Sequence, residues 1–257
     1  MMTPQIVKRY SAPVPRYTSY PTAPHFSAAV GPTQYAGWLA QIAAHERLSL
    51  YFHIPFCDTL CWYCGCNTKA VRRHKPVAAY LVPLLAEIDN VADIIPNRNR
   101  VSHVHWGGGS PNVLAAGDIL RLSDATRTRF EIVAEAEFAV EIDPRHLTAD
   151  RVAAFAKAGV NRISFGVQDF NRQVQAAINR EQSFETTKAA ADQFRAHGIE
   201  ALNIDLVYGL PHQTVASVEQ TLHQVLALDP DRIAIFGYAH LPARLKQIGR
   251  ASCRERV

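Results

Sequence analysis

Four of the five cysteines in this chain fall within ten positions, at Cys57, Cys61, Cys64 and Cys66. Iron–sulfur clusters are held by cysteine thiolates, usually four. The first three cysteines are separated by three and then two residues, a spacing that can wrap three corners of an iron–sulfur cube. The remaining iron is then free to bind a small molecule, and this spacing suggests S-adenosylmethionine, whose amine and carboxylate can chelate iron. An electron passed to its sulfonium would release a deoxyadenosyl radical, so the cofactor supplies the difficult chemistry.

A zinc site is the main alternative interpretation of these cysteines. Zinc could take all four thiolates, or His53 or His74 could replace one of them. Structural zinc usually takes two well-separated ligand pairs, and the gaps of three, two and one residues suit that arrangement poorly. Inert structural cysteines are the weakest alternative, because so dense a group in a chain with few cysteines points to metal or redox chemistry in a reducing compartment.

The cysteines follow the first of six predicted strands, and the strands alternate with longer helical stretches. This alternation predicts right-handed crossovers and a parallel sheet. Six units fit an α/β fold of the partial (β/α)6 type better than a closed eightfold barrel. The predicted strands are Leu48–Ile54, Val101–Trp106, Ala136–Ile142, Arg162–Gly166, Ala201–Val207 and Arg232–Phe236. The predicted helices between them lie near Pro76–Ile95, Gly117–Phe130, Thr148–Ala158, Ser183–His197 and Thr214–Leu228.

Polar and glycine-rich clusters come directly after the strands. They are Cys57–Cys66, Gly107–Pro111, Asp143–Arg145, Gln168-Asp169 and Tyr208–Pro211. In parallel α/β barrels the loops at the carboxyl ends of the strands build the active site. We therefore expect these clusters to gather on one face of the sheet.

The sequence predicts three parts. Residues 1–47 form an arm and a short helix near Thr33–His45, and the prolines of Ser11–Pro21 exclude regular structure there. Residues 48–247 form the partial barrel. Residues 248–257 resemble a translated sequencing-library adapter and are excluded from the fold argument.

Charge and hydropathy exclude some classes of function. The net charge is +4, and the adapter-like tail supplies +2 of it, from three arginines and one glutamate. The remaining +2 gives no indication of a nucleic-acid partner. No apolar run reaches the roughly 18–20 residues that span a membrane, and no secretory signal is recognisable, so we expect a cytoplasmic protein without membrane partners.

The residues from Tyr51 to Asn67, with the pattern Cys57-x3-Cys61-x2-Cys64-x-Cys66, closely resemble the oxygen-independent coproporphyrinogen III oxidases, which have a radical S-adenosylmethionine barrel. An ordered series of motifs extends the resemblance from about residue 10 to residue 242. These motifs are Pro15–Pro21, His105–Pro111, Val140–Arg145, Gly166–Phe170, Asn179–Gln182, Asn203–Pro211 and Tyr238–Pro242.

The resemblance implies a reaction and its cofactors. The family decarboxylates two propionates of coproporphyrinogen III to vinyl groups and gives protoporphyrinogen IX without dioxygen. It implies a [4Fe–4S] cluster, two S-adenosylmethionine molecules per site, and a reduced flavodoxin- or ferredoxin-like electron donor.

The resemblance also assigns roles to residues. Cys57, Cys61 and Cys64 match the cluster ligands, and Cys66 matches a family cysteine that is not a ligand. Tyr51, Gly108 and Glu141 are expected at the first S-adenosylmethionine, although Glu141 and Asp143 could instead be a solvated pair at a strand end. Arg16 lies on an arm that is expected to reach the active site. Alternatively, Arg16 only holds that arm in place. Around the second molecule we expect Tyr63, Gly109, Ser110, Gln168, Arg180, Asp205 and Ala239.

Some features depart from the family. Tyr63 stands where Phe is frequent, and Ser110 replaces a common Thr. Family members continue past residue 247 with a helical domain, so we expect a truncated chain that could bind the cluster without full turnover. A heme chaperone of the same superfamily remains an alternative, but those relatives generally lack a cysteine at the position of Cys66 and the proline-rich arm. A radical enzyme with another substrate also remains open.

Overall fold

Six parallel strands form one open sheet in the order β1-β4-β5-β6-β7-β8. Each strand pairs in parallel with the next, as strands joined by helical crossovers must. The open sheet of six sequential strands confirms the predicted partial (β/α)6 barrel. The strands are β1 (Leu48–Ile54), β4 (Arg100–Gly108), β5 (Glu131–Ile142), β6 (Arg162–Gln168), β7 (Ala201–Tyr208) and β8 (Arg232–Gly237).

The computed structural model describes residues 5–6, 9, 22 and 25–239. The proline-rich arm with Arg16, the predicted boundary at residue 247 and the adapter-like tail lie outside the described residues. No helix among the described residues is long and apolar enough to cross a membrane.

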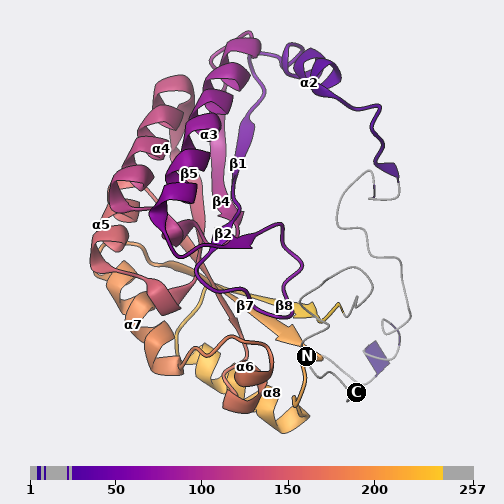
Figure 1. Ribbon diagram of the computed structural model, residues 1–257, viewed down its shortest axis with the longest axis vertical. Coiled ribbons are helices and arrows are strands. Elements are labelled where there is room, and N and C mark those ends of the chain that lie inside the picture. Colours follow the sequence, from indigo (N-terminus) through magenta and orange to yellow (C-terminus); the bar gives the residue numbers. More distant parts are fainter. Residues whose placement is uncertain (1–4, 7–8, 10–21, 23–24, 240–257) are drawn as a thin grey trace.

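The crossover helices form an arc along one side of the sheet (Figure 1). Their ends follow ordinary helix chemistry: α5 ends at Gly159, whose φ of +89° is the left-handed conformation that glycine adopts easily. The helices are α2 (Pro32–Leu39), α3 (His74–Ile94), α4 (Ala116–Arg129), α5 (Ala149–Ala158), α6 (Arg172–Ala177), α7 (Phe184–Arg195) and α8 (Val215–Leu226).

The sheet has one apolar and one polar face because successive side chains of a strand point to opposite sides. In β6, Ile163 and Phe165 are buried against the helices, whereas Arg162 and Ser164 on the other face are only partly buried. Trp106 of β4 is fully buried in the core, where its ring contacts those of neighbouring aromatic residues. The helix-covered face therefore carries the core, and the polar face is left for a site.

Several short elements escape the sequence prediction. Two residue pairs, β2 (Phe56–Cys57) and β3 (Lys69–Ala70), form a small parallel sheet around the cysteine loop. Helix α6 and the 3-10 turns η2 (Pro111–Val113) and η3 (Pro144–His146) were also not predicted. Helix α2 ends at Leu39 instead of the predicted His45.

Candidate functional site

The cysteine loop opens onto a cavity of about 350 Å³ at the carboxyl ends of the strands. Loops after β1, β4, β5 and β6 contribute to it, as expected for a parallel α/β sheet, together with Asp205 on β7 and Phe236 on β8. The predicted site residues that line this cavity are Cys57, Cys61, Tyr63, Cys64, Cys66, Gly108, Gly109, Ser110, Glu141, Gln168, Arg180 and Asp205.

Two predicted residues do not line this cavity. Tyr51 lies beside it on β1, with an exposed ring stacked on that of His105 at 5.7 Å between centroids. Ala239 is exposed and does not line the cavity. Arg16 lies outside the described residues.

Backbone contacts hold the cysteine loop in place. The Val71 N–H donates to the Cys57 carbonyl oxygen at 2.9 Å, which extends the β2–β3 pairing. Further along the loop, the Asn179 side chain donates to the Leu60 carbonyl oxygen at 2.8 Å. The Trp62 N–H donates to the Ile178 carbonyl oxygen at 2.9 Å. The loop is therefore fixed by the chain itself at Cys57 and at Leu60 and Trp62.

Gly109, directly after β4, allows the chain to approach the start of the cysteine loop. The N–H groups of Gly109 and Ser110 donate to the carbonyl oxygens of Ile54 (2.8 Å) and Phe56 (2.7 Å). A Cβ at Gly109 would collide with the carbonyl oxygen of Phe56. The close approach that Gly109 permits is therefore to the protein backbone.

The environment of the cysteine thiols is uneven. Burial raises the pKa of Cys57 to about 11, partly offset by a 3.3 Å hydrogen bond with Thr68 Oγ1. Hydrogen bonding from Cys66 lowers the pKa of Cys64 to about 6 and raises that of Cys66. The Cys66 N–H also donates to Cys64 Sγ at 3.4 Å. Cys66 therefore favours the thiolate form of its neighbour.

A buried ion network faces Cys61. The side chains of Asp143, Arg145 and Arg180 are 12%, 10% and 8% exposed. Arg145 Nη2 and Arg180 Nη1 donate to Cys61 Sγ at 3.7 and 3.4 Å, and Arg145 also binds Asp143 at 2.6 Å. Although burial opposes ionisation, the two guanidinium groups hold the pKa of Asp143 well below its usual range. Two cations and one carboxylate leave one positive charge, which a thiolate at Cys61 would balance.

Two carboxylates lie on the polar face of the sheet. Glu141 accepts from the Gly108 N–H at 3.2 Å and pairs with His105 Nε2 at 3.1 Å. Asp205 accepts from Ser164 Oγ at 3.0 Å and Asn203 Nδ2 at 2.8 Å, and burial raises its pKa. Both carboxylates line the cavity and could accept hydrogen bonds from hydroxyl or amine groups of a ligand.

The donor set suits an iron–sulfur cluster. Cys57, Cys61 and Cys64 all line the cavity, and the positive charge beside Cys61 complements thiolate ligation. No group of three or more His, Cys, Asp or Glu side chains within the described residues is arranged to hold a single metal ion. The ligand thiolates of a cluster bind separate iron atoms, so they do not need to converge on one point.

Sequence reasoning missed several residues that shape the site. Asp143 is buried in the ion network, which corrects the alternative of a solvated pair with Glu141. Arg145 and Thr68 were not predicted to contact the cysteines, and Asn179 was only part of a resemblance motif. The position of Arg145 two residues after Asp143 at a strand end was a usable signal, because a short turn can fold such a pair together.

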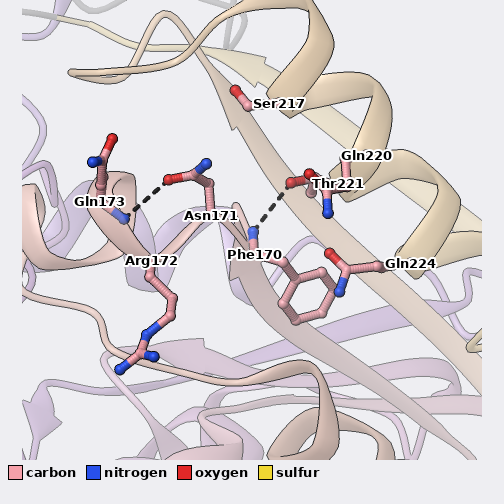
Figure 2. A pocket seen from close by; sticks show the side chains of 8 residues that line it. All are labelled: Phe170, Asn171, Arg172, Gln173, Ser217, Gln220, Thr221 and Gln224. Atoms are coloured by element: carbon pink, nitrogen blue, oxygen red, sulfur yellow. Dashed lines mark hydrogen bonds between the residues drawn. The ribbon is translucent and has the colours of Figure 1, made fainter.

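A second pocket of about 330 Å³ lies between the loop after β6 and helix α8 (Figure 2). There the Phe170 N–H donates to Thr221 Oγ1 at 3.2 Å and the Gln173 N–H to Asn171 Oδ1 at 2.9 Å. The described residues that line this pocket include no cysteine and no predicted site residue. The cysteine cavity is therefore the candidate site.

Comparisons with known proteins agree with this geometry. The model of the radical SAM superfamily matches residues 51–225. Oxygen-independent coproporphyrinogen III oxidases from Bradyrhizobium diazoefficiens and Paracoccus denitrificans are 53% and 47% identical, over 89% and 93% of this chain. The solved structure of coproporphyrinogen III oxidase from Escherichia coli, a radical SAM enzyme, superposes with a TM-score of 0.89 at 39% identity over 98% of this chain.

The comparisons cover only part of those proteins. The chain spans 51% and 53% of the two curated relatives and 56% of the solved structure, about half of their length. They confirm the fold and the resemblance inferred from the motifs, and they support a [4Fe–4S] cluster and S-adenosylmethionine as cofactors. The chain belongs to the radical SAM superfamily, and its curated relatives within it are oxygen-independent coproporphyrinogen III oxidases.

Proposed function

We propose that this chain belongs to an enzyme that oxidatively decarboxylates two propionates of coproporphyrinogen III to vinyl groups, giving protoporphyrinogen IX without dioxygen. The observation that carries the proposal is that the three spaced cysteines line one cavity together with most of the residues expected around two S-adenosylmethionines. The choice of substrate is supported by the sequence identity of 53% and 47% to two coproporphyrinogen III oxidases over most of the chain.

In this proposal Cys57, Cys61 and Cys64 bind three irons of a [4Fe–4S] cluster. When bound and reduced, the cluster supplies the electron that cleaves S-adenosylmethionine to a hydrogen-abstracting radical. Arg145 and Arg180 compensate negative charge on the Cys61 sulfur. Cys66 stays unligated at the cavity wall and hydrogen-bonds Cys64, so its role is to adjust that ligand.

The first S-adenosylmethionine would lie toward β1, β4 and β5. Glu141 accepts from its amine or ribose hydroxyls, and His105 and the Gly108 N–H hold this carboxylate in place. Tyr51 packs on His105 and so lies on the same side. The backbone of Gly108 lines the cavity next to this carboxylate.

The second S-adenosylmethionine would lie toward β6 and β7. Arg180 would attract its carboxylate by charge, because the guanidinium nitrogens already donate to the Gly166 carbonyl oxygen and to Cys61 Sγ. Asp205 would accept from its hydroxyl or amine groups. Tyr63, Gly109, Ser110 and Gln168 line the same cavity, Ala239 follows β8, and Arg16 would reach the substrate from the arm.

Isotope transfer tests this proposal most sharply. The anaerobically reconstituted chain is incubated with dithionite, S-adenosylmethionine and coproporphyrinogen III deuterated at the propionate β-carbons. We expect deuterium in the 5′-deoxyadenosine, read by mass spectrometry, because the radical abstracts a β-hydrogen. A Cys57→Ser variant is the matched control and should form no deoxyadenosine. Tight stoichiometric heme binding with no cleavage would instead favour a heme chaperone.

A further inference from the structure

A run of basic residues directly follows the cysteine loop. Residues 59–86 contain no Asp or Glu, and they carry Lys69, Arg72, Arg73 and Lys75. All four side chains are exposed, and within the described part of the chain none forms an ion pair. His74 between them hydrogen-bonds Asp118 at 2.5 Å. We call residues 69–75 the basic segment.

The basic segment lies where its charge is unfavourable for the fold. It enters α3, whose N-cap is Arg73 and whose first turn has no acidic residue. The N–H groups at a helix N-terminus form its positive end, which favours anions and disfavours cations. No side chain caps this helix end either. Charges that oppose the local rules of the fold are expected where function requires them.

The basic segment is also one strand away from a proposed cluster ligand. Strand β3 pairs with β2 so that Ala70 lies opposite Cys57, and Lys69 opposite Phe56. Neighbouring strands lie roughly 4.8 Å apart. A protein seated on the basic segment would therefore come close to the cysteine loop without entering the cavity.

We propose that the basic segment is the docking surface for an acidic one-electron carrier protein. This inference rests on the proposed function, because a radical SAM cluster takes its electron from outside. One electron passes from the reduced carrier to the oxidised cluster; the carrier is oxidised by one electron, the cluster is reduced by one, and no atom is transferred. Charge complementarity steers such encounters and chiefly raises the association rate. Nucleic acid fits less well, because it offers no reason for the segment to adjoin Cys57.

Stopped-flow reduction of the reconstituted chain tests the surface. Reduced flavodoxin, an acidic carrier, is mixed anaerobically with each protein, and bleaching of the cluster absorbance gives the second-order rate constant. The variants are R72E/R73E, the neutral R72Q/R73Q, and a control, R121E/K157E, which makes the same charge change at exposed residues of α4 and α5. Dithionite reduction of each protein is measured in parallel.

We expect R72E/R73E to be reduced by flavodoxin about tenfold more slowly than the wild type at low ionic strength. The difference should shrink as salt shortens the screening length toward roughly 3 Å at 1 M. R72Q/R73Q should fall between them, and the control should stay within about twofold of the wild type. Equal flavodoxin rate constants in R72E/R73E and the control would overturn the inference. It would also be overturned if R72E/R73E lost binding to a single-stranded oligonucleotide but kept the wild-type flavodoxin rate constant. Failure of dithionite to reduce a wild-type cluster would instead refute the proposed function.

Discussion

Removing the negative charge from the buried network at Cys61 should destabilise the fold strongly. Asp143→Asn leaves Arg145 and Arg180 buried side by side with no carboxylate between them. Because all three side chains are at most 12% exposed, solvent screens this loss little. Breaking a buried ion pair costs about 3–5 kcal/mol. We expect about 3 kcal/mol, the lower end, because the Asn oxygen can still accept one hydrogen bond.

Urea denaturation of the chain without cluster, followed by circular dichroism, measures this loss. With a slope of about 3 kcal/mol per molar urea, the midpoint should fall by about 1 M. The control is Glu131→Gln, which breaks the exposed Arg100–Glu131 pair and should cost at most about 1 kcal/mol. An Asp143→Asn loss no larger than that of the control would refute the account of a buried network.

The stabilisation by Asp143 should also depend on pH. Its folded pKa lies below the value of 3.8 expected for an unperturbed Asp, so the folded state favours the ionised form. The contribution is therefore fully present above about pH 3.8 and is lost as the pH falls toward the folded pKa. The stability gap between wild type and Asp143→Asn should narrow only in that acidic range, and a gap that closes near neutral pH would contradict this assignment.

Four further substitutions test other parts of the structure. Arg73→Asp gives α3 a capping acceptor and a favourable charge, so its free energy of unfolding should rise by about 1 kcal/mol in urea titrations; a fall would contradict the helix-end argument. Gly109→Ala should cost roughly 1–3 kcal/mol and reduce bound iron, because its Cβ meets Phe56. Gly117→Ala, with open space around it, should cost nothing measurable. Cys66→Ser should keep its full iron content, and iron loss would make Cys66 a ligand.

The six strands of the large sheet and the five longer helices between them were predictable from sequence, whereas the short elements and some strand ends were not. Strand β1 has the predicted bounds Leu48–Ile54. Strand β5 begins at Glu131, five residues before its predicted start. Glu131 and Glu135 suggested a polar loop, but both side chains are exposed at the start of the strand, where a sheet can accommodate them. Helix α6 has only six residues, too few for a helical period to show.

The site was predictable where residues share a loop, and less so where tertiary contacts decide. Four of the five predicted strand-end clusters meet at the cavity, whereas Tyr208–Pro211 after β7 does not line it. From sequence, Asp143 could have been a solvated neighbour of Glu141. The residues around Asp143 do not reveal its ion pair with Arg180, which is distant in the sequence. The contacts of Arg145 and Arg180 with Cys61 likewise arise only when the loops after β1, β5 and β6 converge.

Anaerobic reconstitution with iron and sulfide, followed by dithionite and S-adenosylmethionine, tests the central claim most directly. We expect about four irons per chain and formation of 5′-deoxyadenosine, because three thiolates leave one iron of the cluster open. The triple variant with Ser at positions 57, 61 and 64 should bind no cluster. A chain that holds one zinc ion and no iron would contradict the account.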